Sequence, residues 1–175
     1  MRTATVLLAL LAACACSPGP SPEQLNGRTM GTTYSVTVAR LPKGVRRQTL
    51  QSAVGEALSE VNRALSTYDP RSEISRFNAN ASTDPVRVSP PLRAVAAIAG
   101  EVSVATGGAF DVTVGPLVQA WGFGVELPAA EIAPGPGAIN GLRAEVGFDR
   151  LELGADGHSL RKTVPGLQLD VNGIA

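Results

Sequence analysis

Residues 106–122 read TGGAFDVTVGPLVQAWG and bring two adjacent glycines, a carboxylate, a proline and the only tryptophan into one short stretch. Because Gly107 and Gly108 carry no side chains, the backbone there can adopt positive φ and let a ligand approach closely. If the residues that follow are extended, Asp111 and Thr113 point to one face and the valines to a core. Two interpretations follow: a ligand-binding bend, or a tight turn in which Asp111 caps backbone N–H groups.

The neighbouring residues indicate where this stretch lies in the fold. A helix is predicted to begin at Ser89-Pro90-Pro91 and to end at Gly107, with apolar residues on one side. Gly107 and Gly108 therefore follow a helix, whereas the glycines of phosphate-binding loops precede one. The stretch is thus not a dinucleotide-binding fingerprint. Pro116 suits the first turn of a second, short helix over residues 117–121.

The composition indicates a globular protein. Hydrophobic residues make up 44% of the 175 residues and charged residues 17%, which is enough apolar material for a sizeable core. Fifteen basic residues balance fifteen acidic ones, so the net charge does not favour nucleic acid as a partner.

The N-terminus predicts an export signal. Arg2 precedes an apolar run, residues 6–13, which is too short to span a bilayer but has the length of a signal-peptide core. The sequence LAAC that ends at Cys14 resembles a bacterial lipoprotein signal, in which cleavage leaves a lipidated cysteine; the alternative is a plain secretory peptide. We therefore expect residues 1–25 to be signal peptide and tether. A lipid anchor on the periplasmic side of a bacterial membrane, with the inner membrane favoured, follows from this prediction.

The remaining residues, 26–175, are predicted to form one domain. Apolar residues at spacings of three and four predict a long helix from Leu50 to Leu65. Alternating residues predict a half-buried strand over 29–40. Further short strands are expected at 86–89, 151–153, 160–162 and 167–171, and short helices at 72–78 and 139–146. Because helices and strands do not alternate strictly, the predicted class is α+β, a mainly antiparallel sheet packed with two long helices.

Several segments, in the same order along the chain, resemble the FAD:protein FMN transferase family, also called the ApbE or flavin transferase family. They are MGTTYSV (30–36), VNRALSTYDPRSEISRFN (61–78), GGAFDVTVGPLVQAWGFG (107–124), and VGFDRLEL (146–153) with GLQLDVNGIA (166–175). The resemblance implies an ApbE-like fold. It also implies an enzyme that cleaves the pyrophosphate of FAD and places the FMN half on a threonine of a target flavoprotein, using Mg²⁺.

The targets implied by this resemblance are subunits of membrane redox complexes, which agrees with a tethered, extracytoplasmic protein. Two other functions remain open on the same residues. One is a flavin-binding lipoprotein, or a metal-dependent FAD pyrophosphatase, that does not modify proteins. The other is a tethered scaffold with a vestigial pocket.

The resemblance assigns flavin contacts to six residues, of which five are described first. Met30 matches the family methionine near the flavin, and Tyr68 matches an aromatic that packs by the cofactor. A tyrosine beyond a helix end is suited to cover a planar ring; the less favoured alternative is a residue that packs on the core. Ala109, Phe110 and Asp111 match the AFD segment of the family, which lines the FAD site. Tyr68 and the AFD bend are therefore expected to share one cleft.

At the C-terminal end, Asn172 stands where the family has Ser in a D-x-S-x-x-A pattern; the resemblance implies a flavin contact at this position, and the larger side chain is a departure from the family pattern there. Ala175 matches the position whose backbone carbonyl helps hold Mg²⁺, a suitable hard oxygen ligand. The other metal ligands of the family follow that alanine. The resemblance therefore treats the chain as C-terminally truncated, assigns no catalytic residue, and implies that these 175 residues alone are inactive. His158 is interpreted as a solvated turn residue rather than a general base.

Overall fold

The computed structural model describes residues 22–30, 32–123 and 133–174. The chain divides into two compact units, residues 1–55 and 56–175. Cys14, the predicted lipidation site, and Ala175, the predicted metal ligand, lie outside the described residues.

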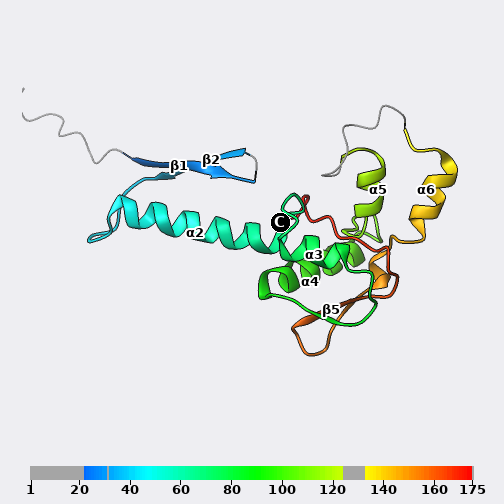
Figure 1. Cartoon of the computed structure of the whole chain (residues 1–175). Helices are drawn as coiled ribbons and strands as arrows, with labels where there is room; N and C mark the ends of the chain where they lie inside the picture. The colour runs from blue at the N-terminus through cyan, green and yellow to red at the C-terminus, as the bar shows by residue number, and fades with distance from the viewer. Residues whose placement is uncertain (1–21, 31, 124–132, 175) are drawn as a thin grey trace, which may run out of the picture. The chain divides into compact units, whose positions relative to one another are not determined.

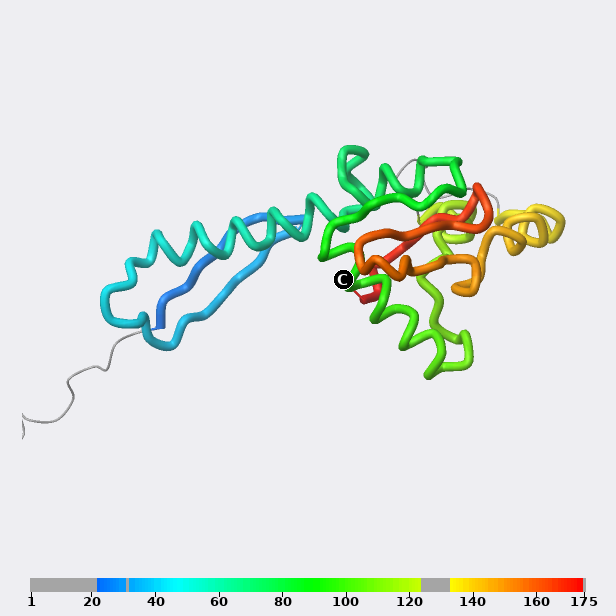
Figure 2. Tube along the Cα trace, turned by 90° about the horizontal axis from the view of Figure 1, so that it is seen from below, coloured from blue at the N-terminus to red at the C-terminus, as the bar shows by residue number. Residues whose placement is uncertain are grey.

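The first unit is an antiparallel hairpin that lies alongside the beginning of a helix (Figures 1 and 2). Strands β1 (Glu23–Thr29) and β2 (Thr32–Val38) pair along their whole length. Helix α2 (Arg47–Leu65) begins in this unit and ends in the second. A hydrogen bond links the hairpin to the helix: the Gln51 side chain donates to the Tyr34 hydroxyl at 2.9 Å.

Strand β1 is a correction to the sequence analysis. It begins at Glu23, inside the stretch that was assigned to a tether ending at residue 25. The strand escaped prediction because Leu25 is its only large apolar residue, so no alternation marks it; Leu25 is nevertheless fully buried. The predicted half-buried strand over 29–40 is confirmed in part, as β2 over Thr32–Val38, most of whose side chains are exposed; Met30 occupies the turn between the two strands with a φ of 48°.

The second unit contains a small antiparallel sheet and several helices (Figure 1). The sheet has the order β3-β5-β4, made of β3 (Val86–Arg87), β4 (Leu151–Leu153) and β5 (Ser159–Lys162). Figure 2 shows the β4–β5 hairpin, in orange, beside the green segment that carries β3. The helices are α3 (Glu73–Ala79), α4 (Pro90–Ala105), α5 (Gly115–Ala120), α6 (Pro136–Arg143) and the 3₁₀ helix η1 (Phe148–Arg150).

The start of α3 and the end of α4 follow the predicted signals, whereas α5 and α6 begin two and three residues before the predicted 117 and 139. Ser72 caps α3, because its hydroxyl accepts a 3.1 Å hydrogen bond from the backbone N–H of Ser75. Helix α4 ends at Ala105, and the next two glycines have φ values of 61° and 83°, as the diglycine predicted. Ser89, which precedes α4, instead donates its backbone N–H to the carboxylate of Glu73, and so ties the start of α4 to the start of α3.

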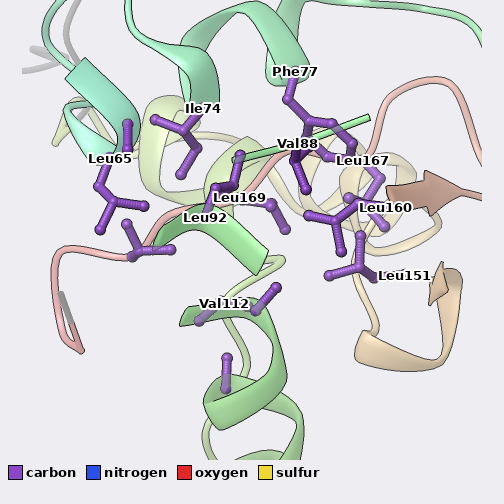
Figure 3. Close-up of a cluster of buried hydrophobic side chains, with 14 residues drawn as sticks. Leu65, Ile74, Phe77, Val88, Leu92, Val112, Leu151, Leu160, Leu167 and Leu169 are labelled. Atoms are coloured by element: carbon purple, nitrogen blue, oxygen red, sulfur yellow. The ribbon is translucent and has the colours of Figure 1, made fainter. Parts of the chain in front are cut away.

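The core of the second unit lies between α3, α4, the sheet and the segment that follows β5 (Figure 3). Its members include Ile74, Leu92, Leu160 and Leu167, which are completely buried. Phe77 is the aromatic residue among its buried members, with 2% of its surface exposed. Among the described residues, none of the helices has the combination of length and apolar character that crossing a membrane requires.

Two predicted extended segments are wrong. Residues 111–114 form a turn, and residues 167–171 form no strand; a single parallel bridge joins Val114 to Gln168. The reason is that other groups satisfy the backbone of the second segment. Both the N–H and the C=O of Leu169 pair with the side-chain amide of Asn78, and the N–H of Asp170 donates to the carbonyl of Val112.

Candidate functional site

A cavity of about 370 Å³ opens in the second unit. Its walls come from the loop that ends α2, from α3, from α5 with the residues just after it, and from the segment after β5. The lining residues are Thr67, Tyr68, Pro70, Ser75, Asn78, Ala79, Gly115, Val118, Gln119, Phe123, Gln168, Leu169, Asp170 and Asn172. A volume of this size accommodates a multi-ring heterocycle.

The lining combines exposed aromatic rings with neutral hydrogen-bonding groups. Tyr68 is 60% exposed and Phe123 is 76% exposed, so both rings are available to a ligand. The amide of Gln119 donates to the amide oxygen of Gln168 at 2.7 Å, across the cavity lining. Among the described lining residues, Asp170 is the only charged side chain. The cavity therefore suits a planar, uncharged ring that carries polar edges.

Two of the predicted flavin residues, Tyr68 and Asn172, line this cavity together. Their segments also contact each other: the Asn172 side-chain nitrogen donates to the hydroxyl oxygen of Thr67, the residue before Tyr68, at 3.5 Å. The Phe110 ring is close to the same place, 4.0 Å from where a side-chain carbon on Gly173 would stand. Three segments that are far apart in the sequence thus meet at Asn172 and Gly173.

The loop that carries Tyr68 is held by a carboxylate. Asp69 accepts hydrogen bonds from the backbone N–H of Arg71 at 2.9 Å and from its guanidinium at 3.2 Å. These bonds, the backbone one first, hold the pKa of Asp69 below its ordinary value. Glu73 does not join this pair, since it accepts hydrogen bonds from Ser89.

The AFD bend does not share the cavity with Tyr68, which corrects the expectation of one cleft. None of its three residues lines the cavity. The Asp111 carboxylate accepts hydrogen bonds from the N–H and the hydroxyl of Thr113, at 2.8 and 2.7 Å, and from the N–H of Phe148 at 2.9 Å. Asp111 therefore caps backbone donors, as the alternative interpretation predicted, while the residues after it reach the cavity through Gly115 and α5. A flavin contact by Ala109, Phe110 or Asp111 stays a prediction.

Met30 and His158 are not among the residues that line this cavity. Met30 belongs to the first unit and is 49% exposed, and its place beside a flavin stays a prediction. His158 is exposed in the turn between β4 and β5, in agreement with its interpretation as a solvated residue.

Comparison with known proteins places these features in a family. The sequence pattern described as the ApbE family matches residues 30–175. The chain belongs to the ApbE family. FAD:protein FMN transferase of Vibrio cholerae is 39% identical over 176 residues, which is 100% of this chain and 52% of that protein. The transferase of Haemophilus influenzae is 37% identical over 171 residues, covering 94% of this chain and 49% of that protein.

Solved structures confirm the ApbE-like α+β fold. The flavin transferase ApbE from Vibrio cholerae superposes with a TM-score of 0.80 at 39% identity, covering 86% of this chain and 48% of that one. The flavinyl transferase ApbE of Pseudomonas stutzeri, in its apo form, also has a TM-score of 0.80, at 34% identity over 88% of this chain and 48% of that one. The chain therefore spans about half the length of the ApbE relatives that it matches.

Magnesium is the metal that the ApbE resemblance implies. Within the described residues, no three His, Cys, Asp or Glu side chains lie close enough together to hold a metal ion. The described residues therefore supply no cluster of three such side chains for Mg²⁺, whose oxygen ligands in proteins also include backbone carbonyls and water.

Sequence reasoning missed several residues in and near this cavity. Gln119, Gln168 and Asn78 line the cavity, but neutral amides carry no distinctive sequence signal. Lys162 was also missed: it is only 1% exposed, and its ammonium donates to the carbonyl oxygens of Asn78 and Leu167 at 3.2 Å each. Its place in a predicted strand was the available signal, because alternation puts it on the same face as the fully buried Leu160.

The absence of a side chain at Gly115 lets α5 lie close to the backbone of Gln168 on the opposite cavity wall. A side-chain carbon at this position would lie 2.8 Å from the backbone oxygen of Gln168, which cannot move without breaking the Val114–Gln168 bridge. We expect Gly115→Ala to lower the free energy of unfolding by about 2 kcal/mol, measured by urea denaturation. Gly137→Ala in α6 is the matched control, because nothing lies within 4 Å of that position. Equal effects of the two substitutions would contradict the close approach.

Because Lys162 is buried, we expect the free energy of unfolding to rise with pH in the alkaline range. Burial lowers the pKa of Lys162 from its ordinary value of 10.5, which the unfolded chain restores. As the pH rises through the lowered pKa, the unfolded state binds more protons than the folded state, so the free energy of unfolding increases until about the ordinary value. Urea denaturation from neutral pH to about pH 10 should therefore show wild type gaining stability relative to Lys162→Met. Parallel curves for the two proteins would refute this.

Proposed function

We propose that the complete protein containing this chain is an FAD:protein FMN transferase. It transfers the FMN part of FAD to a threonine of a target flavoprotein, in a Mg²⁺-dependent reaction. The main support is the cavity that Tyr68 and Asn172 line together. The whole of this chain also matches 52% of a transferase, at 39% identity. In this transfer the threonine oxygen forms a bond to the phosphorus of the FMN half. The pyrophosphate P–O bond to AMP breaks, AMP leaves, and the threonine hydroxyl loses its proton.

The lining chemistry indicates which part of FAD enters the cavity. Tyr68 and Phe123 offer aromatic faces, and the neighbouring amides and hydroxyls offer hydrogen bonds to a heterocycle. Asp170 would repel the negatively charged diphosphate, and no described lining residue carries a compensating positive charge. We therefore assign the isoalloxazine ring to the cavity and the diphosphate to the outside of it.

The proposed location and partners follow from the N-terminal sequence. Lipidation of Cys14 would anchor the protein at the periplasmic side of a bacterial membrane, with the inner membrane favoured. Flavoprotein subunits of membrane redox complexes, the targets that the resemblance implies, are accessible from that position. Labelling with a radioactive fatty acid, lost in Cys14→Ala but retained in Cys16→Ala, tests the anchor.

Mass spectrometry tests the transfer. The complete protein is incubated with FAD, Mg²⁺ and a threonine-containing peptide from a candidate target, and FMN is expected on the threonine, with AMP released. A peptide with valine in place of the threonine, and a reaction with chelator, serve as controls. Release of free FMN and AMP with an unmodified peptide would instead favour the alternative FAD pyrophosphatase. FAD binding without any turnover would favour a flavin-binding lipoprotein.

A competition assay tests the assignment of the ring. Riboflavin, which contains the ring without a phosphate, is expected to displace FAD from the cavity, whereas ADP is not. Tyr68→Ala should weaken riboflavin binding by about tenfold, since an exposed aromatic contact contributes roughly 1 kcal/mol beyond its buried area. Displacement by ADP alone would contradict the assignment.

A further inference from the structure

Lys162 is a lysine buried inside the second unit. Its side chain lies inside the second unit with 1% of its surface exposed, and the ion pairs recorded for the described residues do not include it. Burying an ammonium group is costly unless its donors are satisfied. The donors reach the carbonyls of Asn78 and Leu167, and the Phe77 ring centroid lies 5.1 Å from the nitrogen.

The two carbonyls belong to segments that are also joined by a side chain. The Asn78 amide donates to the carbonyl of Leu169 and accepts from its N–H, each at 2.8 Å. The end of α3 and the segment after β5 are therefore held together by two bonds from Lys162 and two from Asn78. This seam takes the place of the strand pairing that the segment after β5 lacks.

The seam joins two walls of the cavity. Ser75, Asn78 and Ala79 line it from α3, and residues 168–170 with Asn172 line it from the other side. We propose that Lys162 is a positioning residue of the flavin cavity: by bridging the carbonyls of Asn78 and Leu167, it fixes the spacing between the α3 wall and the 168–172 wall. The identity of the ligand rests on the proposed function, whereas the seam itself does not.

Lysine suits this position better than an apolar residue of similar length. Methionine would fill the same space but donate no hydrogen bond, so the two carbonyls would be left without a donor inside the protein. Such groups recover their hydrogen bonds by admitting water, which would open the seam and move Asn78 and Gln168 in the cavity wall.

Kinetics of the complete protein test the role of Lys162. We expect Lys162→Met to raise the KM for FAD by about tenfold, the cost of one charged hydrogen bond, with kcat at saturation changed less than about twofold. Arg161→Met, next to it on β5 but in an exposed ion pair with Glu152, is the matched control and should keep the wild-type KM. Leu151→Ala, in the core but outside the cavity lining, should lower Tm without changing KM.

Hydrogen exchange provides a readout that needs no flavin. The N–H of Leu169 and the amides beside it should exchange about tenfold faster in Lys162→Met, while the N–H of Val88, which bonds to His158, stays protected. If Lys162→Met does not fold, Lys162→Gln replaces it. Glutamine keeps an N–H₂ donor, so its KM for FAD is expected to lie between the wild-type value and about ten times that value. A wild-type KM together with wild-type exchange at Leu169 in the folded variant overturns the proposal. Wild-type protein that fails to bind FAD would overturn the proposed function instead, while the exchange result still decides the seam.

Discussion

Replacing Phe77 with alanine is expected to lower the free energy of unfolding by about 4 kcal/mol, the largest effect among the substitutions considered. Phe77 is 2% exposed and reaches into the cluster of buried side chains shown in Figure 3. The substitution removes the ring from the core and leaves a cavity. It also removes the aromatic face near the Lys162 ammonium, 5.1 Å from the ring centroid. Urea denaturation, followed by circular dichroism, measures the change.

Phe123→Ala is the matched control, because it is the same chemical change at a side chain that is 76% exposed. Its free energy of unfolding should stay within about 0.5 kcal/mol of wild type. The same variant should weaken riboflavin binding, since Phe123 lines the cavity. A loss of stability in Phe123→Ala as large as in Phe77→Ala would show that the core has been placed wrongly.

Asp111→Ala is expected to lower the free energy of unfolding by about 3 kcal/mol. The carboxylate accepts three hydrogen bonds, two from Thr113 and one from Phe148. Thr113 is completely buried, so its N–H would lose its partner without gaining water. The Thr113 hydroxyl also accepts from the N–H of Gly147 at 2.7 Å, so loss of Asp111 loosens the whole turn before η1.

Two further variants separate capping from charge. Asp111→Asn keeps one oxygen that can accept both bonds from Thr113 but presents an N–H₂ group to the N–H of Phe148, so it should lose less stability than Asp111→Ala. Asp149→Ala removes an exposed carboxylate from the same turn and should change stability by less than about 0.5 kcal/mol. Wild-type stability in both Asp111 variants would mean that the carboxylate serves only a ligand, as the family resemblance implied.

Much of the architecture was predictable because local signals decided it. The α+β class, the helix over residues 47–65, the Ser72 cap and the helix end before Gly107 all depend on residues within one or two turns of each other. The candidate site was predictable only in part. Tyr68 and Asn172 do line one cavity, but that prediction came from a family resemblance, since neither residue has a local pattern that marks a ligand site.

The sequence alone determined the start of α3, the end of α4 and the positive φ at Gly107 and Gly108, because caps and glycines act on their immediate neighbours. Only the tertiary structure decided what Asp111, Asn78 and Lys162 do. Asn78 pairs with Leu169 across 91 residues and Lys162 with Asn78 across 84, and a hydrogen bond carries no trace of its distant partner in the local sequence. For Asp111 the local sequence allowed either a ligand or backbone N–H groups as partners, and the tertiary structure showed that the N–H of the distant Phe148 is one of them.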